Sequence, residues 1–135
     1  MGMPDDIATL LSDYGIVGGA TGWSVFAGFR PSSPDKVVCL FEYPGTPVDP
    51  KSTFTKPGLV VSVRGESLSR SETAAADAEA KSAEIDALLH RYRGTIGGTR
   101  YLHAQRATSG AVTLYDDSDD RPDVRRSYEL WKSED

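Results

Sequence analysis

The sequence is poor in residues that build disulfides or metal sites, with one cysteine, Cys39, and two histidines, His90 and His103. A single cysteine excludes an internal disulfide, and its spacing from the two histidines matches no zinc site. Cys39 lies inside the apolar run 37–41. We therefore expect a buried thiol that packs as a small hydrophobe, because a reactive thiolate needs an electropositive and partly exposed setting.

The chain also has fewer basic than acidic residues, with 15 Lys and Arg against 20 Asp and Glu, so its formal net charge is −5. This balance argues against a surface that grips nucleic acid, although DNA could still pass beside such a protein. No stretch approaches the roughly 18 consecutive apolar residues of a membrane span, and the N-terminus lacks the basic region of a signal peptide. We expect a soluble protein made in the cytoplasm.

Motifs that carry chemistry are missing too. The glycine-rich segment 15–22 lacks the Gly-Lys-Ser/Thr ending of a phosphate-binding loop, and no G-x-S-x-G elbow occurs. The acidic run 116–123 places Pro122 where a calcium loop requires glycine, so a solvated hairpin tip is the favoured interpretation. Residue order alone cannot exclude a Ser-His-Asp triad, but no residue supports an enzyme, and we expect neither catalysis nor a cofactor.

The first half of the chain predicts a helix followed by strands. At 135 residues it is long enough for one domain with its own core, spanning 1–135. Ile7, Leu10, Leu11 and Tyr14 fall on one stripe of an N-terminal helix that Gly15 should end. Segment 23–29 predicts a strand with Trp23 in the core. Segment 36–43 is apolar on both faces, as expected of a central strand.

A loop with four prolines, 44–57, separates this strand from a second apolar strand, 59–64. Proline cannot donate to a sheet ladder, so we expect the loop to be irregular throughout. Loops of this length in compact domains are uncommon, and both a docking arm and a merely flexible connection remain open. Alternation in the second strand directs Leu59, Val61 and Val63 toward the core and Arg64 to the opposite face.

The second half predicts the longest helix and a hairpin. We expect the helix over 71–93, closed by Gly94, with Ile85, Leu88 and Leu89 on its buried stripe and alanines that permit close packing. Strands follow at 99–108, 112–115 and 124–132, the last two joined by the acidic loop 116–123. In the first of these strands, simple alternation places Leu102 and Ala104 opposite Tyr101 and His103.

Several segments in this order resemble the bacteriophage tail-terminator family, also called minor capsid proteins of long-tailed phages. They are a strand ending in Phe41-Glu42-Tyr43-Pro44-Gly45, the proline-rich loop, the strand Pro57-Gly58-Leu59-Val60-Val61-Ser62-Val63-Arg64, the long helix, and Gly98-Thr99-Arg100-Tyr101-Leu102. Val60 stands where the family commonly has Gln, and the acidic tip is heavier than usual. The resemblance implies an α+β fold, with a single mixed β-sheet against which an N-terminal helix and one long helix pack.

The resemblance also implies a function without catalytic residues, cofactor or metal. Family members form a hexameric ring that caps the tail tube, halts its polymerisation and meets the head-side stopper or connector, while DNA passes through without specific binding. The partners expected are other copies of the chain, the major tail tube protein and the stopper. Two alternatives remain open, namely another head–tail joining protein and an unrelated small ligand-binding α+β domain.

Two sets of residues are candidates for contacts in such an assembly. The candidate interface set comes from the proline-rich loop and the last strand: Pro47, Val48, Pro50, Phe54 and Trp131. Trp131 could equally be a protein-contact anchor or ordinary core cover. The acidic set, which could line the lumen or its rim or form an outward solvated tip, consists of Asp116, Asp117, Asp119, Asp120 and Asp123.

Overall fold

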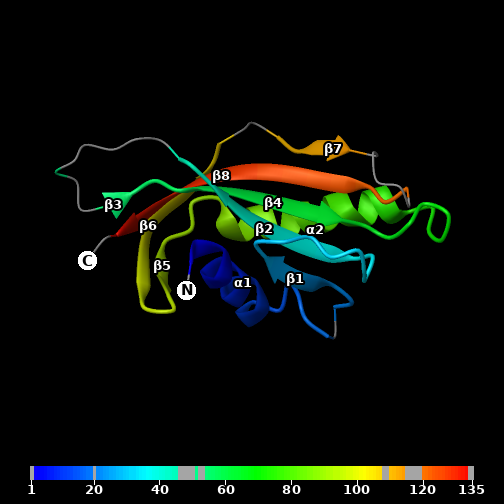
Figure 1. The fold of residues 1–135 in the computed structure, drawn as a ribbon, viewed down its shortest axis with the longest axis horizontal. Coiled ribbons are helices and arrows are strands. Elements are labelled where there is room, and N and C mark those ends of the chain that lie inside the picture. The colour runs from blue at the N-terminus through cyan, green and yellow to red at the C-terminus, as the bar shows by residue number, and fades with distance from the viewer. Residues whose placement is uncertain are drawn as a thin grey trace.

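The computed structural model describes residues 2–19, 21–45, 51, 54–107, 110–114 and 120–133, which form an α+β fold with one mixed sheet (Figure 1). The elements in chain order are α1 (Met3–Asp13), β1 (Ser24–Ala27), β2 (Val37–Tyr43), β3 (Phe54–Thr55), β4 (Gly58–Arg64), α2 (Ala74–Leu89), β5 (Gly94–Ile96), β6 (Thr99–Arg106), β7 (Val112–Leu114) and β8 (Asp123–Ser133). This architecture confirms the expected fold class.

The sheet is organised around β8, the longest strand. The main path runs β1-β2-β4-β8-β6-β5, with β3 and β7 pairing with the two ends of β8. Only the β1–β2 pairing is parallel among these strands, and the remaining pairs are antiparallel. β2 lies between β1 and β4, as the apolar run in its sequence predicts.

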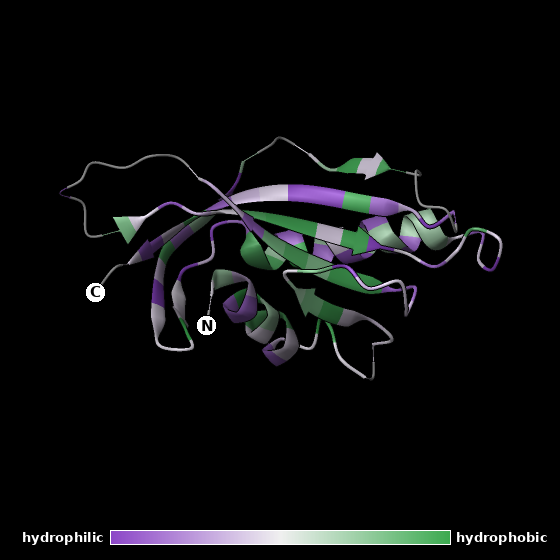
Figure 2. Cartoon of the chain, in the orientation of Figure 1, coloured by the Kyte–Doolittle hydropathy of each residue, from purple (hydrophilic) through white to green (hydrophobic). Residues whose placement is uncertain are grey.

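Both helices pack on the same face of the sheet. α2 crosses β4 and β8, while α1 packs against β1, β2 and β5 (Figure 1). Val38 and Leu40 of β2 and Leu59, Val61 and Val63 of β4 are buried in the core beneath the helices. Figure 2 colours much of both strands as hydrophobic. Of the six side chains expected to meet here, five are at most 1% exposed: Leu59, Val61, Val63, Ile85 and Leu89. Leu88 is half-buried and packs against the edge of this core.

α1 ends at Asp13, one residue before Tyr14, the last member of its predicted apolar stripe. Ile7, Leu10 and Leu11 are buried, but Tyr14 is 64% exposed, so the prediction that it shares the stripe is wrong. The helix stops at Asp13 and Gly15 takes a φ of 70°, which turns the chain and points Tyr14 outward.

α2 is shorter than the predicted 71–93, and Gly94 does not close it. The backbone N–H of Arg91, in a left-handed conformation with φ 71°, donates to the Ala104 carbonyl of β6 at 2.6 Å. This bond attaches the chain to the sheet, and Gly94 begins β5. The helix therefore ends at Leu89 because a tertiary hydrogen bond replaces the next helical one.

Two further expectations for strands are wrong because of pairing with β8. A register shift between Tyr101 and His103 interrupts the alternation in β6, so Tyr101 and Ala104 are both buried. The loop 44–57 is not irregular throughout, because Phe54 and Thr55 form β3 and pair with Ser133 and Lys132 of β8.

Candidate interaction site

One face of the sheet carries neither α1 nor α2, and the candidate site residues Phe54, Asp123 and Trp131 lie on it. We call it the helix-free face. Strand register and alternation assign to it Phe41 and Tyr43 of β2, Val60, Ser62 and Arg64 of β4, and Asp123, Arg125, Glu129 and Trp131 of β8. Near its middle, a depression of about 520 Å³ is lined by residues that include Tyr43, Gly58, Gln105 and Glu129. Gly58 is required there, because an added Cβ would lie 2.3 Å from the Tyr43 ring.

At one end of this face, Trp131 forms an aromatic cluster with Phe54, Lys56 and His103. The Trp131 and Phe54 rings stack with centroids 5.7 Å apart, and His103 meets the Trp131 ring edge-on at 5.6 Å. The Lys56 ammonium lies 4.7 Å from the centre of the Trp131 ring, within cation–π range. Pairing of β3 and β6 with β8 brings these side chains together from three segments of the chain.

The aromatic cluster joins two members of the candidate interface set. Trp131 and Phe54 are each half-buried, so each keeps part of its ring at the surface. Held by mutual stacking, these rings lose little conformational entropy when a partner covers them. Pro47, Val48 and Pro50 lie outside the described residues. Half-buried aromatic rings that are already stacked suit a protein–protein contact rather than a catalytic site.

The acidic set is divided by the structure. Asp116, Asp117 and Asp119 lie outside the described residues, and Asp120 is exposed with a φ of 56°. Asp123 differs, because it begins β8 and is only 3% exposed. It accepts a hydrogen bond from Ser62 at 2.7 Å and pairs with Arg30 and Arg125. Asp123 thus belongs to the sheet and not to the tip of the acidic loop.

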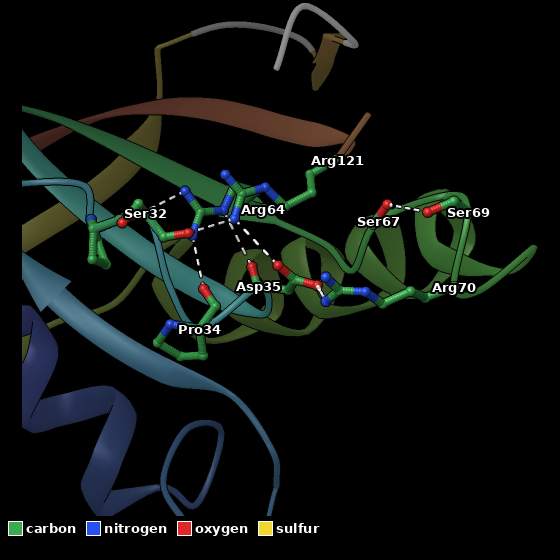
Figure 3. A network of polar contacts seen from close by, with 9 residues as sticks. Ser32, Pro34, Asp35, Arg64, Ser67, Ser69, Arg70 and Arg121 are labelled. Carbon is green, nitrogen blue, oxygen red and sulfur yellow. Dashed lines mark hydrogen bonds and ion pairs between the residues drawn. The ribbon is translucent and has the colours of Figure 1, made fainter. Parts of the chain in front are cut away.

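A cluster of arginines, which the sequence reading missed, occupies the same end of the helix-free face as Asp123. Arg64 is 2% exposed and donates to the backbone carbonyls of Pro31, Pro34 and Asp35 (Figure 3). Arg121 donates a hydrogen bond to the Ser32 carbonyl and forms an ion pair with Asp35. Arg70 pairs with the same Asp35 carboxylate at 2.6 Å. These bonds hold the connection between β1 and β2 against the end of the sheet. The prediction that Arg64 lies on the face opposite Leu59, Val61 and Val63 was correct. Its carbonyl partners lie about 30 residues earlier in the sequence, and no local pattern indicates them.

The helical face contains two buried tyrosine–aspartate pairs that fix the helices to the sheet. Tyr101 donates to Asp6 of α1 at 2.6 Å, and Tyr128 donates to Asp86 of α2 at 2.8 Å. Hydrogen bonds from the Arg106 guanidinium, with a further contribution from Tyr128, hold the pKa of Asp86 below its usual range. Burial and the neighbouring aspartates raise the pKa of both tyrosines.

Side chains suited to metal binding are not brought together in the described part of the chain. Cys39 is fully buried and burial raises the pKa of its thiol, which confirms the expectation of a packing role. No group of three or more His, Cys, Asp or Glu among the described residues could hold a metal ion. Neither helix in the described ranges is long and apolar enough to cross a membrane.

Comparisons with known proteins agree with this arrangement. The profile of a family described as bacteriophage tail terminator protein matches residues 10–130. The fold resembles a chain in the virion of a native gene transfer agent particle, with a TM-score of 0.67 at 14% identity over 97% of this chain and 94% of that one. A search of curated proteins gives no significant match. The chain therefore belongs to the bacteriophage tail terminator family, whose members are structural proteins of phage tails.

Proposed function

We propose that the protein forms a closed ring, most simply a hexamer, that caps the tail tube, stops its polymerisation and joins the tail to the head-side stopper or connector. The observation that carries this proposal is the family match over residues 10–130. The helix-free face supports it, because its half-buried aromatics and arginines suit a role in protein contacts.

In this proposal the aromatic cluster of Phe54, Lys56, His103 and Trp131 contacts the tube or a neighbouring copy. Its rings are already stacked, so a partner can cover them without ordering them first. The proline-rich segment that contains Pro47, Val48 and Pro50 leads into β3 and therefore into this cluster. We include these three residues in the proposed contact.

DNA passes through the ring without specific binding. A chain with a formal charge of −5 produces a ring that repels phosphates, so the duplex can slide instead of being held by counterion release. We propose that Asp116, Asp117, Asp119 and Asp120 face the lumen or its rim. Changing these four residues to Lys should slow DNA ejection and leave assembly intact. An assembled structure with this loop on the outer circumference would exclude a lumenal role.

The experiment uses a phage that lacks this gene and is supplied with the protein in trans. Trp131→Ala should fold normally and bind tail tubes at least about tenfold more weakly, because hot-spot aromatics commonly contribute this much. Tyr14→Ala, which removes an aromatic that is 64% exposed on the helical side, is the matched control. If the Trp131 variant attached to tail tubes normally, the aromatic cluster would not be part of the tube contact. Wild-type protein that binds the connector but never a tube end would favour another head–tail joining role.

A further inference from the structure

At one end of the sheet, five strands lie side by side in the order β1-β2-β4-β8-β7. Residues 123–125 of β8 pair with 62–64 of β4 on one side and with 112–114 of β7 on the other. The pairings give one row of neighbours across these strands: Phe26, Cys39, Ser62, Arg125 and Val112. β1 and β7 are therefore the two edges of this end of the sheet, and Figure 1 shows them at its opposite borders.

The outer edge of β1 carries backbone groups that the fold leaves unpaired. Ser24 and Gly28, at the two ends of the strand, each donate an N–H to a carbonyl on the β2 side, at 3.3 and 2.8 Å. Because backbone groups alternate in direction along a strand, Val25 and Ala27 point their N–H and carbonyl groups away from β2. The described residues include no hydrogen-bond partner for these outward groups.

The outer edge of β7 is open in the same way. Gly65 donates to the Pro122 carbonyl at 2.8 Å, so even-numbered residues at the start of β8 point their backbone groups to β4 and odd-numbered residues point theirs to β7. The register partners of the odd-numbered residues are Val112 and Leu114, which therefore bond β8. Thr113 then points its N–H and carbonyl outward, and no hydrogen bond reaches them from the part of the chain that the structure describes.

The two edges match each other in direction and in the faces that they continue. β1 runs parallel to β2 and the three following pairings are antiparallel, so β1 and β7 run in opposite directions. Val25 packs against the core beneath the helices, and the Thr113 hydroxyl lies 3.5 Å from Glu79 of α2, so both side chains point to the helical face. A β1 strand from a second copy can therefore pair antiparallel with β7 and continue both faces of the sheet.

Exposed apolar side chains accompany both edges. Val112 of β7 is 57% exposed, and Phe29, which follows β1, is 55% exposed. Phe29 packs edge-on against Phe26 of β1, with ring centroids 5.2 Å apart. Pairing of Thr113 with Val25 of a second copy sets a register in which Val112 lies directly opposite Phe26 of that copy. An aromatic side chain opposite a β-branched one stabilises neighbouring strands, so this register covers the apolar groups that each edge leaves exposed.

We infer that β1 of one copy pairs antiparallel with β7 of the next, so that the sheet continues from copy to copy around the ring. This inference rests on the proposed ring and names its subunit contact. The two edges are different surfaces, so the contact is heterologous and closes into a ring with a suitable rotation. Both edges are short, with four residues in β1 and three in β7, which makes a single pairing weak. In a closed ring every copy makes two such contacts, and closure strengthens the assembly.

Proline at an outward position blocks each edge. Ala27→Pro on β1 and Thr113→Pro on β7 each remove an outward N–H, the place in a sheet where proline is tolerated best. Thr113→Val keeps the N–H and the branched shape, and it is the matched control. Val112→Lys is a second block of the β7 edge that changes an exposed side chain only, which guards against loss of folding. Unfolding curves establish which variants are folded, and sedimentation and native mass then report their assembly.

Each folded blocked variant should assemble at least about tenfold more weakly than wild type, because it loses a donor or gains a charge at the pairing edge. The proline ring also excludes the approaching strand. T113V should assemble as wild type does. A wild-type ring together with unchanged assembly of the folded blocked variants overturns the inference and leaves the ring proposal intact.

A pair of introduced cysteines tests the register itself. In the inferred register Leu114 lies opposite Ser24 of the next copy, in a pair without mutual backbone hydrogen bonds, where side chains come closest. Ser24→Cys/Leu114→Cys in one chain should give a ladder of disulfide-linked products under mild oxidation, and the buried Cys39 should not react. Val25→Cys/Leu114→Cys is the matched control. Val25 lies one residue away on the opposite face, so this pair should give no ladder.

The cysteine readout separates failure of the contact from failure of the ring. A ladder from the first pair in a protein that is otherwise monomeric supports the contact and contradicts the ring. A ring without a ladder contradicts the contact and leaves the ring proposal intact. Equal ladders from both pairs report random collision and overturn the inference. A monomeric protein without a ladder contradicts both the contact and the ring.

Discussion

Removal of the Asp86 carboxylate should destabilise the fold chiefly by stranding a buried hydroxyl. Tyr128 is fully buried, and its hydroxyl donates to Asp86 Oδ1 at 2.8 Å. The Arg106 side chain, which pairs with the same carboxylate through Nε at 2.8 and 2.9 Å, is 40% exposed and can be hydrated when the pair is lost. Asp86→Ala therefore leaves one unsatisfied buried donor, which lowers the free energy of unfolding by about 1–3 kcal/mol.

Two companion variants test this reasoning in urea unfolding monitored by circular dichroism. Asp86→Asn keeps an oxygen acceptor for Tyr128 and should lose less stability than D86A. Tyr128→Phe in the D86A background removes the stranded hydroxyl and should recover part of the loss. A double variant D86A/Y128F no more stable than D86A would refute the argument, because the stranded hydroxyl would then contribute nothing.

The same carboxylate makes stability depend on pH in a defined direction. Hydrogen bonds from Arg106 lower the pKa of folded Asp86, so its contribution is fully present above the unfolded pKa of about 3.9. That contribution is lost as the pH falls through the lower folded pKa. The stability difference between wild type and D86N should therefore shrink below about pH 4. A difference that is constant from neutral to acidic pH would contradict this linkage.

Three further predictions concern stability. Leu89→Ala should lower the free energy of unfolding by about 2–5 kcal/mol in urea titrations, and Leu88→Ala by clearly less, because Leu89 is fully buried and Leu88 half-buried; equal losses would contradict the packing. Arg64→Met should cost at least about 2 kcal/mol, since carbonyls of the 31–35 segment lose their donor; an unchanged midpoint would refute that role. Burial raises the pKa of Tyr101, so its contribution is lost above about pH 10, and Tyr101→Phe should flatten the alkaline decline of stability; an unaltered decline would contradict this.

The elements that sequence patterns predict well are those whose structure depends on local periodicity. β2 and β4 are continuous apolar runs, and both form central strands. The alternation in β4 correctly separates Leu59, Val61 and Val63 from Arg64. The β7–β8 hairpin also follows from local turn signals.

The features that sequence patterns miss depend on partners far along the chain. The end of α2 is set by the bond from Arg91 to Ala104, and the burial of Arg64 by carbonyls of the 31–35 segment. The register shift in β6 likewise arises from pairing with β8. At the site, the pattern indicated Trp131 and Phe54 separately, but only pairing of β3 and β6 with β8 shows that they form one cluster. The arginine cluster had no local signal, because Arg64, Arg70 and Arg121 reach the 31–35 segment from different parts of the chain.

The most direct test of the central claim is tail-tube growth in the presence of the purified protein, followed by electron microscopy. Tail tube protein from the same phage is polymerised with and without the full chain. If the protein is a ring-forming terminator, tubes stop growing when it is added and each stopped tube carries a ring at one end. Tubes that keep lengthening and show bare ends in the presence of excess folded protein would contradict the account.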